Sequence, residues 1–165
     1  MKTILTIITL FSWTFTYSQN NTFKAQIFIE ESSVVSGGVV IFPLTKDTIA
    51  IGSSDTAMID LSSPNNRIFY FLWSGWKSKV FRFDKNNPSN DIKKVYVPDT
   101  IFYRHYEEKK TCPICLKSKH VIPIKYGMPT KKMFGQAKHG KFRLGGCIIN
   151  EDNPKFYCKS DNFEF

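Results

Sequence analysis

The cysteines constrain the fold of this chain more than any other residue type. There are four, and all lie in the carboxyl-terminal third: Cys112, Cys115, Cys147 and Cys158. The first two enclose Pro113 and Ile114, and a C-x2-C turn of this kind points both sulfurs at one metal ion. Zinc prefers four tetrahedral ligands, so two thiolates leave its shell half filled. The spacing therefore predicts a zinc site that is completed from elsewhere in the chain.

The remaining ligands are expected near the end of the chain, where a zinc ribbon has its second knuckle. Cys158 supplies a third thiolate, and Asp161 stands at the C-x2-C offset from it with a carboxylate that can coordinate zinc. Two other residues compete with Asp161 for the fourth position. Cys147 is a softer ligand than a carboxylate, and His120 follows Cys115 by five residues. The residues alone leave the fourth ligand open among these three.

The amino terminus has the pattern of a secretory signal peptide. Lys2 supplies a positive charge, Thr3 to Thr14 form an apolar run, and small residues precede position 19. We therefore predict that residues 1–18 are removed on export, and we exclude them from the fold. No later stretch of the sequence is long and apolar enough to span a membrane. The expected location is periplasmic or extracellular, in a bacterium.

Export makes two disulfides the main alternative to a metal ion, because disulfides persist in oxidising compartments. Cys147 and Cys158 are placed to pair across a predicted hairpin. A bridge between Cys112 and Cys115 would close a very short loop and add little stability, since disulfide stabilisation grows with loop length. We therefore favour zinc, and a metal-free chain stapled by disulfides is the alternative.

Residues 19–98 alternate between short apolar runs and turn residues. Seven runs have strand character: FKAQIFIE, GGVVIFPL, TIAIG, TAMIDL, RIFYFLW, KVFRFD and IKKVYVP. Period-2 alternation groups four residues of the first run on one face: Phe23, Ala25, Ile27 and Ile29. We also expect Val80, Phe81 and Phe83 near a core between two sheets. This spacing is typical of a β-sandwich, and no helix is expected before residue 100.

Part of this region resembles a known domain family. IGSSDTAMIDL followed by FLWSGWKSKVFRF is similar to the carboxypeptidase regulatory-like (transthyretin-like) sandwich. Residues 75–78 (GWKS) match its Gly-aromatic-Lys-Ser step, and residues 54–57 (SDTA) match its turn in part, with Ala57 where glycine is common. The resemblance covers about residues 23–98. It implies an Ig-like β-sandwich and carries no chemistry.

The last third resembles a small zinc-ribbon-like domain of uncharacterised bacterial proteins. Four pieces carry the likeness: CPIC at 112–115, VIPIKYGMP at 121–129, LGGC at 144–147 and PKFYC at 154–158. The resemblance implies zinc ligands at Cys112, Cys115, Cys158 and the position of Asp161, where the family pattern has a cysteine. In that pattern Cys147 is additional to the four ligands.

One short helix is predicted between the two knuckles, in the stretch PTKKMFGQAKHGK. Thr130 is a suitable N-cap and Gly140 a suitable stop. Met133, Phe134 and Ala137 fall on one face, which we expect to pack in a core. After the helix, KFRL, CIIN and KFYC are predicted strands.

The charge of the chain is concentrated in its second half. The net charge is +9, and the stretch between Glu108 and Glu151 has ten Lys or Arg and no acidic side chain. In an exported chain such a stretch is expected to meet anionic envelope polymers, lipid head groups or another protein, and not nucleic acid. The alternative is that the lysines only solvate a small domain and offset the thiolate charge of the site.

Catalytic motifs are absent from the sequence. It has no H-E-x-x-H, no G-x-S-x-G and no phosphate-cradling glycine loop, and its three histidines form no recognisable constellation. We therefore predict a mainly β, non-enzymatic protein with structural zinc, which serves as a binding or cell-envelope-associated module. A thiol or zinc enzyme is the weakest alternative. The predicted divisions are a signal peptide at 1–18, an Ig-like/transthyretin-like sandwich at 19–98, a connector at 99–111 and a zinc-ribbon-like module at 112–165.

Overall fold

The computed structural model describes residues 21–29, 33–54, 56–63, 67–84 and 91–165. The predicted signal peptide at 1–18 and Asp55 of the predicted turn lie outside these residues. Within them the chain is mainly β, as predicted, with two helices and three sheets. No helix among them is long and apolar enough to cross a membrane.

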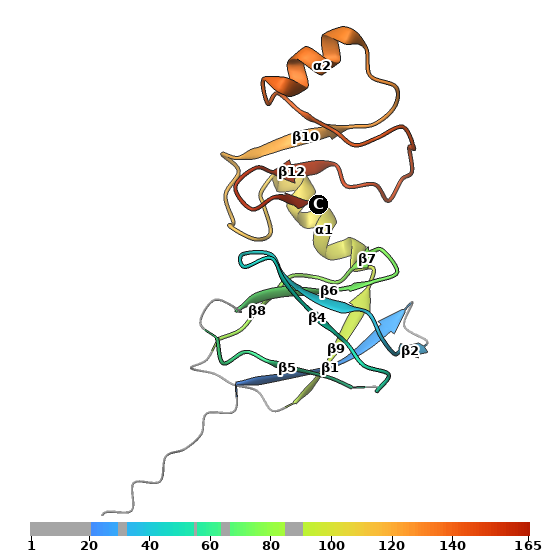
Figure 1. Ribbon diagram of the computed structural model, residues 1–165, viewed down its shortest axis with the longest axis vertical. Coiled ribbons are helices and arrows are strands. Elements are labelled where there is room, and N and C mark those ends of the chain that lie inside the picture. Colours follow the sequence, from blue (N-terminus) through green and yellow to red (C-terminus); the bar gives the residue numbers. More distant parts are fainter. Residues whose placement is uncertain (1–20, 30–32, 55, 64–66, 85–90) are drawn as a thin grey trace, which may run out of the picture.

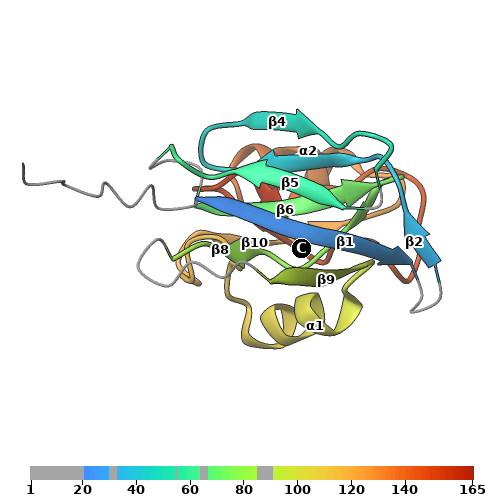
Figure 2. The ribbon, with the colours of Figure 1, turned by 90° about the horizontal axis from the view of Figure 1, so that it is seen from below.

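The first sheet is centred on β1 (Thr22–Ile29). β9 (Ile92–Val97) lies parallel to β1 along one edge. β5 (Ala57–Asp60) and β2 (Ser33–Val35) are antiparallel to β1 and share its other edge, β5 along the first half of β1 and β2 along the second. Figure 2 shows β5, β1 and β9 side by side. The first and last strands of this N-terminal region, residues 21–97, are therefore neighbours.

The second sheet has β6 (Ile68–Trp73) near its centre. β3 (Val39–Phe42) pairs antiparallel with β6 on one side and with β4 (Asp47–Ala50) beyond it. Two short strands, β7 (Trp76–Lys77) and β8 (Phe81–Arg82), pair with β6 on its other side. Figure 1 shows this sheet between the first sheet and the rest of the chain.

A two-residue turn joins β6 to β7, within the stretch that resembles the GWKS step. Ser74 and Gly75 both have positive φ, 46° and 87°, which is the backbone of a type I′ hairpin turn. Ser78 follows β7 and is fully buried. Its backbone N–H donates to the Phe71 carbonyl, and its Oγ accepts from the Phe71 N–H at 2.9 Å. These bonds extend the pairing beyond the two residues of β7.

The inner faces of the two sheets share one core. It contains Ala25, Ile27, Val40, Phe42, Ala57, Ile59, Leu61, Phe69, Phe71, Val95 and Val97. The alternation predicted for the first strand is confirmed, because Ala25 and Ile27 are buried in this core and Phe23 and Ile29 pack against it. Aromatic rings of β1, β6 and β8 meet there in edge-to-face and stacked pairs, which add to the stabilisation from burial.

β6 is buried on both of its faces. Phe69 and Phe71 point into the core between the sheets, whereas Tyr70 belongs to a second cluster on the opposite face. A strand that is buried on both faces has an uninterrupted apolar sequence, and residues 68–73 (IFYFLW) have one. We predicted that Val80 lies near the core between the two sheets. This prediction was wrong, because the outer face of the second sheet is covered as well. Phe81 packs against the inter-sheet core, so Val80, its neighbour on the opposite face, joins the second cluster.

The predicted connector is a helix, α1 (Thr100–Lys109). The Asp99 carboxylate caps it by accepting from the Phe102 N–H at 3.0 Å. Phe102, Tyr103 and Tyr106 pack against the second cluster, and their spacing places them on one side of the helix. α1 therefore runs along one side of the molecule, from β9 toward the C-terminal part of the chain (Figures 1 and 2).

The C-terminal module, residues 112–165, has a sheet of its own. β10 (Val121–Lys125) pairs antiparallel with β12 (Phe156–Cys158) and parallel with β11 (Arg143–Leu144). β13 (Phe163–Glu164) pairs with β12 on its other side. The strands predicted in KFRL and KFYC are present, but CIIN at 147–150 forms none.

α2 (Lys131–Lys138) is the predicted short helix. The Thr130 hydroxyl accepts from the Met133 N–H at 3.3 Å, and Gly140 follows the helix with φ of +71°, so the predicted cap and stop are both confirmed. The expected core packing of the helix was wrong. None of its residues is buried, and Phe134 is 56% exposed.

Candidate metal centre

Two turns that are far apart in the sequence form the centre. The first follows α1: the Cys112 carbonyl accepts from the Leu116 N–H at 2.9 Å, and the Cys112 sulfur accepts from the Ile114 N–H at 3.3 Å. The second is the four-residue connection between β12 and β13, which follows Cys158 and closes through Asn162 at a φ of 49°. The backbone N–H of Lys159 donates to the His120 carbonyl at 2.9 Å, which ties the second turn to the segment between the first turn and β10.

Four ligand atoms converge between these turns. The sulfurs of Cys112, Cys115 and Cys158 and a carboxylate oxygen of Asp161 all lie within 4.8 Å of one another. The sulfurs of Cys115 and Cys158 are 3.9 Å apart. Two sulfurs bound tetrahedrally to zinc at about 2.3 Å lie about 3.8 Å apart, whereas a disulfide needs about 2.05 Å. The cluster can therefore hold one metal ion and has the spacing of ligands around an ion.

The structure separates the three candidates for the fourth ligand. Asp161 Oδ2 lies 3.0 Å from the Cys112 sulfur and 3.1 Å from the Cys158 sulfur. Cys147 is exposed on the loop after β11 and is not part of the cluster. His120 contributes its backbone carbonyl, and its ring is not part of the cluster either. All four cysteines are unpaired, so the pairing of Cys147 with Cys158 is not formed.

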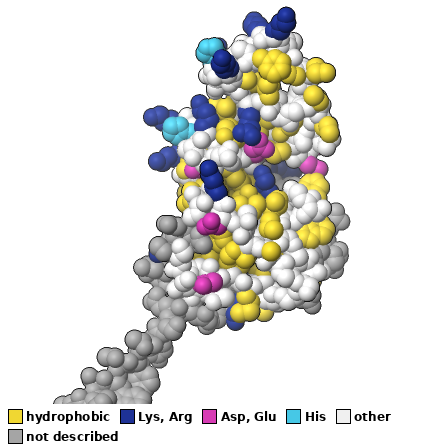
Figure 3. Space-filling view, in the orientation of Figure 1, with side chains coloured by type: hydrophobic (Ala, Val, Ile, Leu, Met, Phe, Trp, Pro, Cys, Tyr) yellow, Lys and Arg dark blue, Asp and Glu magenta, His cyan; other side chains and the backbone are white. Residues whose placement is uncertain are grey.

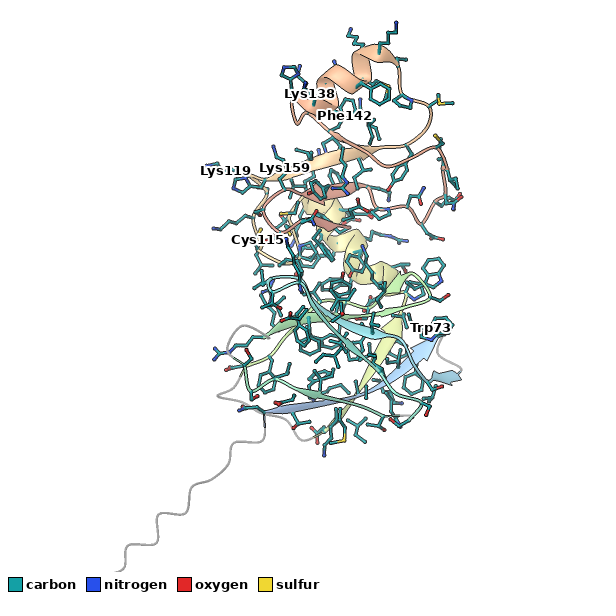
Figure 4. All side chains as sticks on the ribbon, in the orientation of Figure 1. Trp73, Cys115, Lys119, Lys138, Phe142 and Lys159 are labelled. Carbon is teal, nitrogen blue, oxygen red and sulfur yellow. The ribbon has the colours of Figure 1, made fainter. Side chains whose placement is uncertain are left out.

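The site is closed on one side and open on the other. Cys112 and Cys158 are fully buried, and Cys115 and Asp161 are half-buried. The Ser160 hydroxyl lies 3.1 Å from the Cys158 sulfur and 3.6 Å from the Cys115 sulfur. Figure 4 shows Cys115 at the boundary between the two parts of the molecule, on the same side as Lys119 and Lys159. These lysines place positive charge on the side of the module that carries the acidic ligands.

Burial and hydrogen bonding set the protonation of these four ligands when no ion is bound. Burial raises the pKa of the Cys112 thiol far above its ordinary value, and the hydrogen bond to Asp161 raises it further. Burial also raises the pKa of the Cys158 thiol. Burial opposes ionisation of Asp161, but the hydrogen bonds from the cysteine thiols and Ser160 outweigh it and lower the pKa of Asp161. Without an ion, neutral thiols therefore donate to a charged carboxylate, and an ion must displace their protons.

The first turn rests on the outer face of the second sheet. The Arg82 guanidinium, on β8, donates to the Pro113 carbonyl at 2.7 Å and to the Ile114 carbonyl at 2.6 Å. The second cluster lies beside it and joins residues of both parts: Tyr70, Val80, Cys112, Ile114, Cys158, Phe163 and Phe165. The centre thus lies at the joint between the N-terminal region and the C-terminal module. No sequence pattern pointed to Arg82, because its role depends on the docking of two distant segments.

Replacing Arg82 with methionine should loosen this joint. Arg82→Met keeps an unbranched side chain and removes two charge-assisted hydrogen bonds, each worth about 1.5–3 kcal/mol. We expect a lower free energy of unfolding and faster hydrogen exchange at residues 112–117, with zinc content unchanged. Arg104→Met, at an exposed position on α1, is the matched control. Equal exchange in the two variants would contradict a docking role for Arg82.

A separate cleft lies between the two parts of the molecule and does not include the cysteine cluster. Its volume is about 910 Å³, and it is lined by the tip of the β6–β7 hairpin, by α1 and by residues 150–155. Trp76 lines it and is 40% exposed. An ion pair of 2.7 Å between Lys155 and Glu107 links the segment 150–155 to α1.

Comparison with known proteins gives no relative for this chain. No family model matches it, and neither a curated protein nor a solved structure does. The two resemblances drawn from the sequence therefore stay predictions. The case for a metal centre depends on the ligand geometry of this chain alone.

Proposed function

We propose that Cys112, Cys115, Cys158 and Asp161 bind one structural zinc ion, and that the protein is an exported, non-enzymatic binding or envelope-associated module. The observation that carries the proposal is the convergence of four ligand atoms within 4.8 Å from two turns more than forty residues apart. Three thiolates favour zinc among the divalent ions, and one carboxylate completes a tetrahedral shell.

A structural role fits the ligand count better than a catalytic one. A catalytic zinc keeps an open position beside three protein ligands, whereas four side chains are placed to close the shell here. The module also needs such a staple. Its fully buried side chains are few, and most of them lie in the second cluster beside the ligands. On this proposal the module is zinc-ribbon-like and the N-terminal region is an Ig-like/transthyretin-like sandwich.

Export is supported by the signal-peptide pattern at 1–18, and a binding role by the basic stretch between Glu108 and Glu151. Elemental analysis combined with a free-thiol count tests the proposal. Close to one zinc per chain is the expected result. No metal together with no free thiols would favour the disulfide-stapled alternative. An enzyme would instead show turnover that is lost in Cys115→Ser while the fold remains.

Substitution of Asp161 should move zinc retention in both directions. Asp161→Cys offers a fourth soft thiolate and is expected to tighten binding. Asp161→Ala removes a ligand and should weaken binding by more than the roughly 10–100-fold that loss of an outer-shell partner costs. Competition with a chromophoric chelator measures both effects. Asp152→Ala, an exposed carboxylate outside the cluster, is the control. Unchanged retention in both Asp161 variants would remove Asp161 from the shell.

A further inference from the structure

The end of the C-terminal module exposes an unusual amount of apolar side chain. Met128 is 85% exposed, Ile148 74%, Ile149 72% and Phe134 56%. Single exposed apolar residues are ordinary, but a group of large ones marks a surface that contacts something else. We call these four residues the apolar tip.

The loops that carry Met128, Ile148 and Ile149 are joined to each other, and Phe134 lies on α2, which follows the first of these loops. The Gly127 N–H donates to the Gly146 carbonyl at 2.8 Å, which joins the loop before α2 to the loop after β11. The Ile149 side chain lies 3.7 Å from the place where a Cβ of Gly127 would be. Phe134 occupies the N4 position after the Thr130 cap, where a side chain packs back toward the residue before the cap. Figure 3 shows hydrophobic side chains gathered over α2 and the adjacent edge of the module.

Two lysines flank Phe134, the part of the apolar tip that lies on α2. Lys131 and Lys138 are exposed and stand three residues before and four residues after Phe134, so all three lie on one side of α2. The stretch from residue 109 to residue 150 contains no acidic side chain. The nearest acidic residues in the sequence, Glu151 and Asp152, line the cleft between the two parts of the molecule.

We propose that the apolar tip and its lysines dock on an anionic lipid bilayer. Lysines attract anionic head groups, and large apolar side chains at the end of a compact module can enter the interfacial region below them. A soluble polyanion would use the lysines and leave the apolar side chains in water. α2 lies at the end of the molecule away from the N-terminal region, which would stay free for another partner (Figure 1). The inference rests on the proposed function, because the zinc ion holds the module that presents this surface.

Vesicle sedimentation tests the inference on the zinc-loaded chain that begins at Gln19. We expect binding to vesicles of phosphatidylglycerol and phosphatidylcholine, and at least about tenfold weaker binding to phosphatidylcholine alone. Phe134→Ser and the double variant Ile148→Ser/Ile149→Ser should lose binding. Lys131→Gln/Lys138→Gln should weaken it and reduce its salt dependence. Ile101→Ser is the matched control, because Ile101 is 80% exposed but lies on α1.

Three outcomes would overturn the lipid proposal. Vesicle binding that the apolar variants leave intact, while the lysine variant abolishes it, would show attraction by charge alone and overturn entry of the apolar tip into the bilayer. Self-association that is lost in Phe134→Ser would assign it to a second copy of the chain. Equal binding by all variants and the control would show that the apolar tip is not the surface that binds the vesicles. Zinc content is measured in the parent chain and in each variant. A zinc-loaded parent chain that fails to bind the vesicles contradicts this inference alone and leaves the proposed function standing.

Discussion

Removal of the metal is expected to unfold the C-terminal module and leave the N-terminal region folded. Structural zinc contributes about 10–16 kcal/mol of apparent binding free energy in small zinc modules, which is more than a module of this size gains from packing alone. The core between the two sheets contains no residue of the C-terminal module, so it does not depend on the ion. Cys112 and Cys158 lie inside the second cluster, so that cluster should loosen with the metal.

Hydrogen exchange on protein treated with a strong chelator measures this effect. Amides of β10, β12 and the two turns should lose protection, while those of β1, β3 and β6 keep it. Cys158→Ser should reproduce the result without a chelator. Cys147→Ser is the matched control, because Cys147 is exposed and outside the cluster, and it should keep both zinc and protection. Full protection of the module in the metal-free protein would contradict a structural role for the ion.

Opposite responses to pH are expected of the zinc-loaded and metal-free proteins. Zinc binds thiolates, so each thiol that must lose a proton makes the affinity fall by up to tenfold per pH unit on acidification. Three thiols give a maximum of about 4 kcal/mol per pH unit, at about 1.4 kcal/mol for each. The zinc-loaded module should therefore lose its ion and its stability as the pH falls below neutral.

The metal-free protein should weaken at alkaline pH instead. Burial raises the pKa values of the Cys112 and Cys158 thiols, so the folded state favours the protonated form. Their contribution is complete below the ordinary thiol pKa of about 8.5 and is lost as the pH rises above it. The lowered pKa of Asp161 has its effect at acidic pH. Its contribution to the stability of the folded state is lost as the pH falls below about 4. Thermal unfolding between pH 5 and pH 10, with and without zinc, checks both signs. Parallel curves would contradict protonated Cys112 and Cys158 thiols in the metal-free protein.

The sequence predicted the features that depend on residues close together in the chain. Alternation identified the buried face of β1, and the Thr130 cap and Gly140 stop identified α2. The C-x2-C and C-x2-D spacings predicted one site for Cys112, Cys115, Cys158 and Asp161. The structure brings these four residues together. In each case the relevant contacts are close in sequence or follow a fixed period.

Most of the errors and omissions concern contacts between distant segments, and α1 is the exception. Val80 was assigned to the wrong core because nothing in the sequence shows that the outer face of β6 is covered as well. α1 was missed although Asp99 and the aromatic spacing after it are helix signals. CIIN was predicted as a strand between the GG and EDNP turns, but it forms none and leaves Ile148 and Ile149 exposed. Arg82 and the cleft were not foreseen, because both arise where the two parts of the molecule meet.

X-ray absorption at the zinc edge of the purified protein tests the central claim most directly. The account predicts about one zinc per chain, with three sulfur neighbours at about 2.3 Å and one oxygen neighbour at about 2.0–2.2 Å. In Asp161→Cys the oxygen neighbour should be replaced by a fourth sulfur. A protein that binds no zinc, or a zinc ion surrounded by nitrogen and oxygen alone, would contradict it.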